Sequence, residues 1–257
     1  MATTYLTRTQ TAGNQTTWTL SAWFKRNQLS VSHIMPWCAG TYSSTNAVQI
    51  YFPATDELTC HGYDSGGTLL FDVSTNRKFR DTNAYYHMVI ACDTTQAVAA
   101  DRFKIYINGV QETNLLTSSY PAEDLNTAFN QDTVPLVIGN RNGASYYFDG
   151  LMSHIQLVDG LQLAPTEFGE VDATSGIWKI KTACYATPGT NGFCLKMETT
   201  TGSAMGTDSS GEGNNFTVGA GTPTQTVDNP SNVMGTMNPL QLYGSPLTFA
   251  NGNTKAT

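Results

Sequence analysis

Apolar residues recur at every second position along much of this chain, and this spacing limits the possible folds more than any other feature. Successive side chains of a β-strand point to opposite faces, so a period of two predicts strands with one buried face. Helical periodicity is almost absent. In the segment 17–25, the face expected to enter the core consists of Trp18, Leu20, Ala22 and Phe24. The opposite face of this segment is mixed, with both polar and aromatic residues.

Turn residues separate the strand segments at intervals of roughly ten residues. The segment 101–110 ends in Asn108-Gly109, the pair best suited to the positive φ angles of a type I′ hairpin. Strands at this spacing favour an antiparallel sandwich or barrel. Strand–helix–strand alternation is not visible, which excludes an α/β fold.

The segment 147–160 combines a strand pattern with residue types that active sites use. Leu151, Ile155 and Leu157 alternate onto one face, with His154 on the other. An Asp-Gly pair stands near each end, and such pairs favour turns. We therefore interpret this segment as a core strand between turns.

The charge pattern excludes several classes of partner. Charged residues make up 13% of the chain and the formal net charge is −7. Since no basic cluster is present, binding to nucleic acid or to anionic membranes is not expected. The N-terminal segment 1–15 has no apolar core and no positively charged start, so we expect no signal peptide. The longest apolar runs are too short to span a bilayer.

The cysteines give a mixed signal. They are Cys38, Cys60, Cys92, Cys184 and Cys194. An odd number without a secretion signal favours free thiols. Cys92 lies in an apolar strand and is expected to be buried. Cys184 and Cys194 flank a turn-rich loop and could pair, and the spacing of the cysteines does not suggest a zinc site.

Composition changes near residue 197. We predict a β-sandwich over 1–197 and an extended, turn-rich C-terminal arm over 199–257, where apolar residues are sparse and interrupted by Gly and Pro. Such a segment cannot build a core of its own. It is either a linker or an arm that becomes ordered on a neighbouring surface.

Several segments resemble the laminin-G-like branch of the concanavalin A-like lectin/glucanase superfamily. They are WTLSAWFKR, YHMVIACDTT, KIYINGV and LVIGNR, followed by YYFDGLMSHIQLVDG. The resemblance covers roughly residues 5–165 and implies an all-β jelly-roll sandwich of two antiparallel sheets. It also implies that residues 193–218 supply a strand that closes the sandwich, so that 198–218 could extend the first domain.

Segments further along the chain resemble motifs of virion proteins of tailed phages. They are LQLAPTEFGEVDATSGIWKIK, GTNGFCLKM, GTDSSGEGNNFTV and DNPSNVMGTMNPL. This resemblance implies a tail-fibre-like or other surface appendage, made in the host cytoplasm and located in the virion. The implied partners are other virion proteins, further copies of the same chain and a host-surface glycan.

One acidic stretch suggests half of a calcium loop. Oxygen-bearing side chains stand at alternate positions with Gly at the sixth, and these residues are Asp208, Ser210, Glu212 and Asn214. The closing Glu would fall at position twelve, which is Gly219. The alternative is an Asx-type turn between strands. Calcium is the only cofactor that the sequence suggests.

A second candidate site combines aromatic, amide and guanidinium groups. Aromatic rings stack on sugar C–H faces, and amides and guanidinium groups bind hydroxyls. The candidate sugar-binding residues are Asn140, Arg141, Asn142, Tyr146 and Tyr147, with Trp37 in a predicted loop. The alternative is that these aromatics simply pack in the core.

Catalytic patterns are weak. Glu170 and Asp172 begin the E-x-D-x-x-E pattern of laminarinase-like relatives, but the third position is Ser175. The histidines His33, His61, His87 and His154 form no recognisable cluster in the sequence. We therefore predict no catalytic residues.

Three functions remain open at this point. The one we favour is a non-enzymatic virion surface protein whose lectin-like module assists assembly and attaches to host glycans. The second is a capsid decoration protein without sugar binding. The third is a carbohydrate-active enzyme, which would need carboxylates or a His–Tyr pair converging in a cleft.

Overall fold

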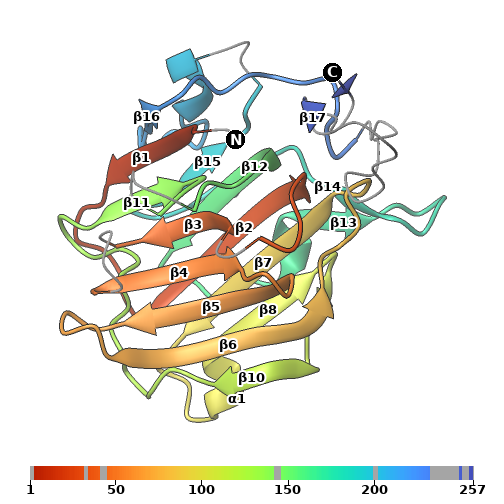
Figure 1. Ribbon diagram of the computed structural model, residues 1–257. Helices are drawn as coiled ribbons and strands as arrows, with labels where there is room; N and C mark the ends of the chain where they lie inside the picture. Colours follow the sequence, from red (N-terminus) through yellow and green to blue (C-terminus); the bar gives the residue numbers. More distant parts are fainter. Residues whose placement is uncertain are drawn as a thin grey trace.

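Two antiparallel sheets packed face to face contain most of the strands of this protein (Figure 1). The computed structural model describes residues 3–31, 34–40, 45–141, 146–198, 202–231, 249–250 and 255–256. Within these residues the helical elements are short, namely α1 (Ala99–Arg102), η1 (Pro165–Glu167) and η2 (Gly202–Gly206). Among the described residues, no helix has the length and apolar character that crossing a membrane requires.

The larger sheet has eight strands in the described part of the chain. Their order is β10 (Leu115–Ser119), β6 (Leu69–Lys78), β5 (Glu57–Tyr63), β4 (Ala47–Phe52), β3 (Ile34–Ala39), β11 (Pro135–Ile138), β1 (Tyr5–Thr9) and β16 (Thr217–Ala220). Neighbouring strands in this sheet pair antiparallel. The predicted two-sheet antiparallel sandwich is therefore confirmed on this side.

The second sheet has six strands in the described residues. Their order is β15 (Phe193–Leu195), β12 (Gly150–Asp159), β2 (Thr17–Arg26), β7 (Tyr86–Asp93), β8 (Phe103–Ile107) and β9 (Val110–Gln111). Two small hairpins complete the strands, β13 (Gly169–Val171) with β14 (Trp178–Ile180) and β17 (Phe249–Ala250) with β18 (Lys255–Ala256).

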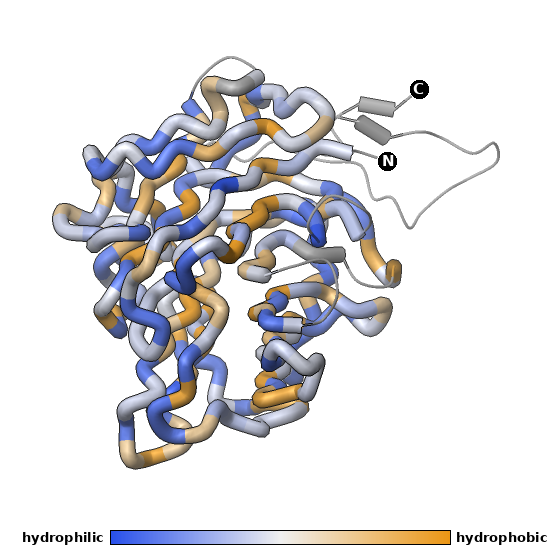
Figure 2. The backbone as a smooth tube through the Cα atoms, turned by 90° about the vertical axis from the view of Figure 1, so that its left-hand side faces the viewer, coloured by the Kyte–Doolittle hydropathy of each residue, from blue (hydrophilic) through white to orange (hydrophobic). Residues whose placement is uncertain are grey.

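The core lies between the two sheets and follows the period-two pattern. Trp18, Leu20, Ala22 and Phe24 of β2 all enter it, as predicted. Figure 2 shows hydrophobic and hydrophilic positions alternating along the strands. Burial of each large apolar side chain stabilises the fold by about 1.5–3 kcal/mol, so this one face of β2 is a major part of the core.

The predicted Asn108-Gly109 hairpin is also confirmed. These two residues connect β8 to β9, where Ile107 pairs with Val110. Their φ angles are 50° and 81°, as a type I′ turn requires. Asn108 tolerates this left-handed conformation and Gly109 carries no side chain to oppose it.

A further layer covers part of the outer face of the six-stranded sheet, above the mixed face of β2. The β13–β14 hairpin lies against it and places Trp178 over Gly109 and His87. His87 stacks on Trp23 at a ring distance of 4.7 Å and on Trp178 at 5.9 Å. The mixed face of β2 is therefore buried beneath a second, aromatic layer.

Hydrogen bonds fix the state of His87 in this layer. The Trp178 indole Nε1 donates to His87 Nδ1 at 3.0 Å, so the ring proton sits on Nε2, 2.9 Å from the Ser21 hydroxyl. Burial lowers the pKa of His87 to about 3. The imidazole is therefore a neutral, structural contact between the sheet and the hairpin.

Within the segment 199–257, residues in the range 202–231 pack against the sandwich. β16 pairs with β1 at the edge of the larger sheet, and β15 pairs with β12 in the smaller one, so both sheets receive a strand from residues 193–220. Further on, Asp228 forms a buried ion pair with Lys25 at 2.7 Å, and the Tyr85 hydroxyl donates to the Asp228 backbone oxygen at 2.8 Å. Residues 232–248 of the predicted arm lie outside the described residues.

Cys184 and Cys194 form a disulfide, which the sequence left open. It joins the loop before β15 to the edge strand of the six-stranded sheet. The other cysteines, Cys38, Cys60 and Cys92, are free and buried. Burial raises the pKa of the Cys38 thiol to about 12, so it stays protonated and unreactive.

Candidate functional site

A large hollow lies at one rim of the sandwich, near the β1–β16 and β12–β15 edges. Its volume is about 650 Å³. β1, β12 and β15 lie together near the top of Figure 1. We call this hollow the rim pocket, and the wall residues that matter below are Tyr5, Phe148, Met152, His154, Lys196 and Glu198.

A β-bulge in β12 shapes the wall of the rim pocket. Along the β12–β2 pairing, Ser153 stands opposite Trp23 and Gln156 opposite Ser21, so β12 has one extra residue. His154 lies in this bulge with φ +47°, a conformation that non-glycine residues rarely adopt. Bulges redirect side chains and are common beside binding sites.

His154 lines the rim pocket with one nitrogen unused. Its Nδ1 lies 2.7 Å from the Ser153 hydroxyl. The residue is only 8% exposed, and among the described residues its Nε2 is buried without a hydrogen-bond partner. A buried polar atom without a partner is costly, so this atom is a natural contact for a bound molecule.

A second strained residue faces the same hollow. Met197 follows β15 and has φ +60°. Because Ile155 pairs with Leu195, continuing this antiparallel register brings Met197 opposite Ser153, next to His154. Strained residues persist where the surrounding structure holds them, and they cluster at ligand sites. The sheet is therefore distorted on two adjacent strands at the wall of the rim pocket.

The buried Lys25–Asp228 pair fixes another wall. The segment 222–231 lines the pocket, and this ion pair anchors it to β2. The side chains of Lys25 and Asp228 are 1% and 0% exposed, so breaking the pair would leave a buried charge. The buried ion pair thus holds the segment 222–231 in place as a wall of the pocket.

Charged groups on both sides of His154 act on its imidazole. Burial lowers the pKa of His154, and Lys196 lowers it further, while Glu198 opposes this shift. The His154 Nε2 lies 4.0 Å from Glu198 Oε1, beyond hydrogen-bond distance. The imidazole is therefore neutral near pH 7, beside one cation and one carboxylate.

The predicted sugar-binding loop adjoins this pocket. The pocket lining includes Gly139 before the loop and Phe148 after it. Tyr146 is 37% exposed, and the Arg141 guanidinium lies 5.7 Å from its ring centroid. Tyr147 is half-buried.

Two predicted sugar-binding residues are buried, and one lies outside the described residues. Asn140 is 0% exposed, and Asn142 falls in the undescribed stretch 142–145. Trp37 is also 0% exposed, so the prediction that it lies in a loop and contacts sugar is wrong. It belongs to β3, where it packs edge-on against Phe24 in the core.

The predicted calcium residues form a hydrogen-bonded loop. The Asp208 carboxylate accepts four hydrogen bonds, from the Cys194, Ser210 and Asn214 backbone N–H groups and from the Ser210 hydroxyl. Its oxygens are thus already engaged, as in the Asx-type turn that was the alternative. Glu212 is exposed. In the described part of the chain, His, Cys, Asp and Glu side chains do not gather in threes around a possible metal position.

Glu170 and Asp172 have a structural role in the β13–β14 hairpin. Both form ion pairs with Lys179, at 3.3 Å and 3.1 Å. Asp172 also accepts hydrogen bonds from Ser175, which lowers the pKa of its carboxyl. The two acids thus stabilise the hairpin and its turn.

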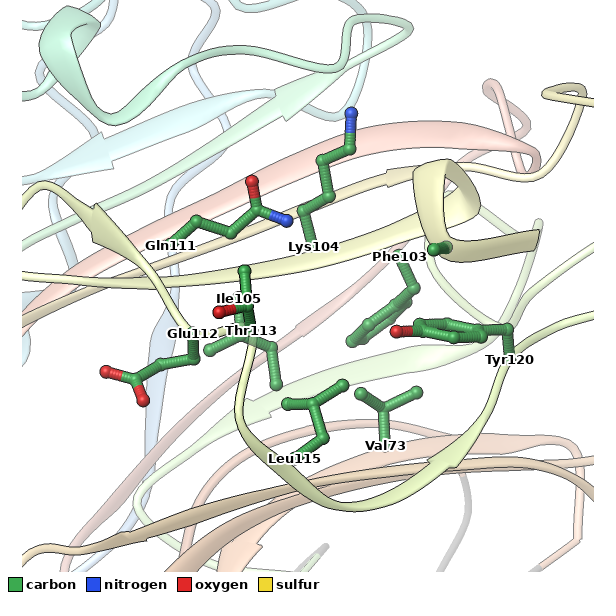
Figure 3. A pocket seen from close by; sticks show the side chains of 10 residues that line it. Val73, Phe103, Lys104, Ile105, Gln111, Glu112, Thr113, Leu115 and Tyr120 are labelled. Carbon is green, nitrogen blue, oxygen red and sulfur yellow. The ribbon is translucent and has the colours of Figure 1, made fainter. Parts of the chain in front are cut away.

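A smaller cavity of about 190 Å³ lies at the opposite edge of the sandwich, between β10 and the β8–β9 hairpin. Figure 3 shows the Tyr120 hydroxyl directed into it among apolar side chains, while the Lys104 ammonium points away. Its floor is formed by Val73, Phe103 and other core residues. The volume of this edge cavity lies below the usual range of small-molecule sites.

The fold and its neighbours define a lectin-like, concanavalin A-like sandwich. Residues 2–165 match the model of the concanavalin A-like lectin/glucanases superfamily, and the chain belongs to this family. A search of curated proteins finds no match. The predicted family is therefore confirmed.

Three solved structures are similar to this chain. One is a proposed carbohydrate-binding protein of Bacteroides ovatus, with 16% identity and a TM-score of 0.51 over 88% of this chain and 58% of that one. Another is the CBM40 of a Ruminococcus gnavus IT-sialidase bound to α2,3-sialyllactose, with 10% identity and a TM-score of 0.42 over 61% and 91%. The third is the enzymatically active domain of tailspike protein 2 of bacteriophage CBA120, with 15% identity and a TM-score of 0.42 over 64% and 25%.

These structures bear on the fold alone. The Bacteroides structure supports the sandwich, and this chain spans 58% of that protein's length. The other two structures are more distant, and no functional conclusion is drawn from them.

Sequence reasoning missed the centre of the rim pocket. It interpreted His154 as an outward residue of a regular strand, whereas the bulge directs it toward a cavity. The pattern does contain a faint signal, because Met152 and Ile155 are both apolar but three positions apart. Strict alternation cannot place both in the core, so one extra residue has to lie between them.

Proposed function

We propose that this protein is a non-catalytic, glycan-binding module of a virion surface appendage. The glycan-binding part of the proposal rests on one observation, the rim pocket with the strained His154 at its wall, whose Nε2 has no hydrogen-bond partner among the described residues. Its volume of about 650 Å³ lies within the usual range for small-molecule sites. Lectin-like folds place such sites at a rim where several loops converge, and here β1, β12 and the segment 222–231 converge.

The chemistry of the pocket suits a sugar. Tyr5 and Phe148 supply aromatic surface for C–H faces, and His154, Lys196 and Glu198 supply hydrogen-bonding groups for hydroxyls. The neighbouring Tyr146 and Arg141 could contact a second sugar residue of a longer glycan. We expect the affinity of a single site to be weak, and many copies on one particle would multiply it.

The appendage half rests on the motif resemblance of segments 161–181, 189–197, 206–218 and 228–240 to tailed-phage virion proteins. Such a protein would assemble with other virion proteins and with copies of itself. Imaging of native particles with a labelled antibody against this chain tests its location. Label on tail fibres supports the proposal, and label on heads alone supports the capsid decoration alternative.

A glycan array with the purified full chain tests the binding half. The matched variants are His154→Asn in the rim pocket and Tyr120→Phe in the edge cavity. Asn tolerates a positive φ, so the first variant keeps the bulge while shortening the side chain. We expect His154→Asn to lose array binding and Tyr120→Phe to keep it. Loss with Tyr120→Phe alone, or no binding by the wild type, contradicts the proposed site.

A further inference from the structure

We infer that the rim pocket selects a neutral N-acetylated sugar, with His154 and three methionines recognising the acetamido group. This inference rests on the proposed function and names the ligand class of the same site. It follows from two features of the pocket wall, a cluster of thioether side chains and a single unpaired imidazole nitrogen.

The first feature is apolar and adaptable. Met152, Met197 and Met205 all line the rim pocket, and they come from β12, from the residue pair after β15 and from η2. Methionine is flexible and polarisable, and it packs well against small apolar groups. Three of the chain's eight methionines thus meet at one cavity. A hydroxyl would gain nothing from such a wall, whereas a methyl group would.

The second feature is a hydrogen-bonding group of adjustable direction. His154 Nδ1 faces the Ser153 hydroxyl, which can donate or accept. The neutral ring can therefore carry its proton on either nitrogen, so Nε2 can accept from an amide N–H or donate to a carbonyl. Among the described residues this Nε2 has no hydrogen-bond partner, and the residue is more than nine-tenths buried.

The acetamido group matches both features at once. It combines a methyl, an N–H donor and a C=O acceptor within a few bonds, which a plain hydroxyl does not. Burial of one methyl and one added hydrogen bond together favour the acetamido sugar roughly tenfold over its hydroxyl counterpart.

The charges argue for a neutral ligand. Lys196 is the cation of the pocket wall near His154, while Glu198 lies 4.0 Å from Nε2 and Asp149 also lines the cavity. A sugar carboxylate near His154 would meet the Glu198 carboxylate, and like charges repel. A uronic acid should therefore bind more weakly than its neutral counterpart.

Matched pairs of methyl glycosides test this inference on the full chain. The pairs are N-acetylglucosamine with glucose, N-acetylgalactosamine with galactose, and glucuronic acid with glucose. Calorimetry or NMR titration gives the affinities, and saturation-transfer NMR shows which ligand protons touch the protein. We expect the acetamido member to bind roughly tenfold tighter in at least one pair, with its methyl protons most strongly saturated.

Two variants separate the contributions. Met152→Ala and His154→Asn should each reduce the acetamido preference, and Tyr120→Phe in the edge cavity should leave it unchanged. Equal affinity within each pair, or tighter binding of glucuronic acid, overturns this inference while leaving glycan binding intact. A preference that survives both rim-pocket variants also overturns it. Absence of binding to every sugar, in this assay and on the array, overturns the proposed function itself.

Discussion

Acidification from pH 7 to pH 5 should weaken this fold through one residue, His87. The imidazole is fully buried between Trp23 and Trp178, and its two nitrogens face Ser21 and the Trp178 indole. A charged ring would lose the hydrogen bond from Trp178, because a protonated Nδ1 cannot accept. It would also lie in a region without water. The folded state therefore stabilises the neutral imidazole of His87 relative to the charged one.

The direction and the size of this change in stability follow from the pKa of His87 in the folded and the unfolded state. In the unfolded chain its ordinary pKa is 6.5, and in the fold burial lowers the pKa to about 3. Between these values the unfolded state binds more protons, so stability falls as the pH drops through 6.5 toward 3. Since one pKa unit corresponds to about 1.4 kcal/mol, the loss from pH 7 to pH 5 is about 2 kcal/mol.

Urea denaturation followed by tryptophan fluorescence at pH 7, 6 and 5 measures this loss. His87→Phe keeps a flat ring but cannot titrate, and His61→Gln serves as a control on the other sheet. His87→Phe should be less stable at pH 7, because Ser21 and Trp178 lose a partner. Its free energy of unfolding should nevertheless fall by about 2 kcal/mol less than that of the wild type between pH 7 and pH 5.

The change of the free energy of unfolding with pH tests this prediction, and its value at a single pH does not. If His87→Phe and the wild type lose the same free energy of unfolding on acidification, the buried neutral imidazole is not the source. A similar flattening in His61→Gln would also refute the reasoning, because it would trace the pH dependence to the other sheet.

Three further predictions concern stability, and urea denaturation checks each of them. Asp228→Ala should cost about 3–5 kcal/mol because Lys25 is left buried without a counter-charge, while Lys25→Met with Asp228→Leu should restore much of the loss. Gly176→Ala should cost about 1–2 kcal/mol from its positive φ alone. Gly109→Ala should cost more, because a Cβ there would lie 2.6 Å from the Trp178 ring, and equal costs would contradict this. Reduction of the disulfide, which closes a loop with a sequence separation of 10, should cost about 2–3 kcal/mol, and no change with reductant would contradict it.

The sequence predicts the sandwich because the pattern that specifies it is local. Alternation places Trp18 and Phe24 in the core, and the Asn108-Gly109 pair predicts a turn from two residues alone. The family resemblance adds the arrangement of strands into two sheets, which no local pattern contains. The core face of β2 and the Asn108-Gly109 turn are predicted correctly because each depends on a few neighbouring residues.

The sequence could not predict the layer over the six-stranded sheet. Trp23 and Lys25 alternate with core residues and therefore resemble outward positions. Their burial depends on Trp178 and Asp228, which lie more than a hundred residues away in the chain. A period of two shows that a strand has two faces, but it does not show what covers each face.

The sequence pattern also does not predict the wall of the rim pocket. The bulge at His154 shifts the register by one residue, so Met152 and not Leu151 packs on the core beside Ile155. The predicted face of Leu151 is therefore wrong. Trp37 was placed in a loop because Pro36 precedes it, but the strand β3 contains both residues. In both places long-range packing overrides a local signal.

The position of β1 has a consequence for synthesis. β1 is synthesised well before both of its partner strands, because its Leu6 pairs with Ile138 on one side and with Val218 on the other. Its second edge thus stays open to incorrect pairing until β16 has been made, and long-range closure of this kind is slow. A nascent chain stopped near residue 165 would leave β1 without its second neighbour and would expose Trp23 and His87 to water.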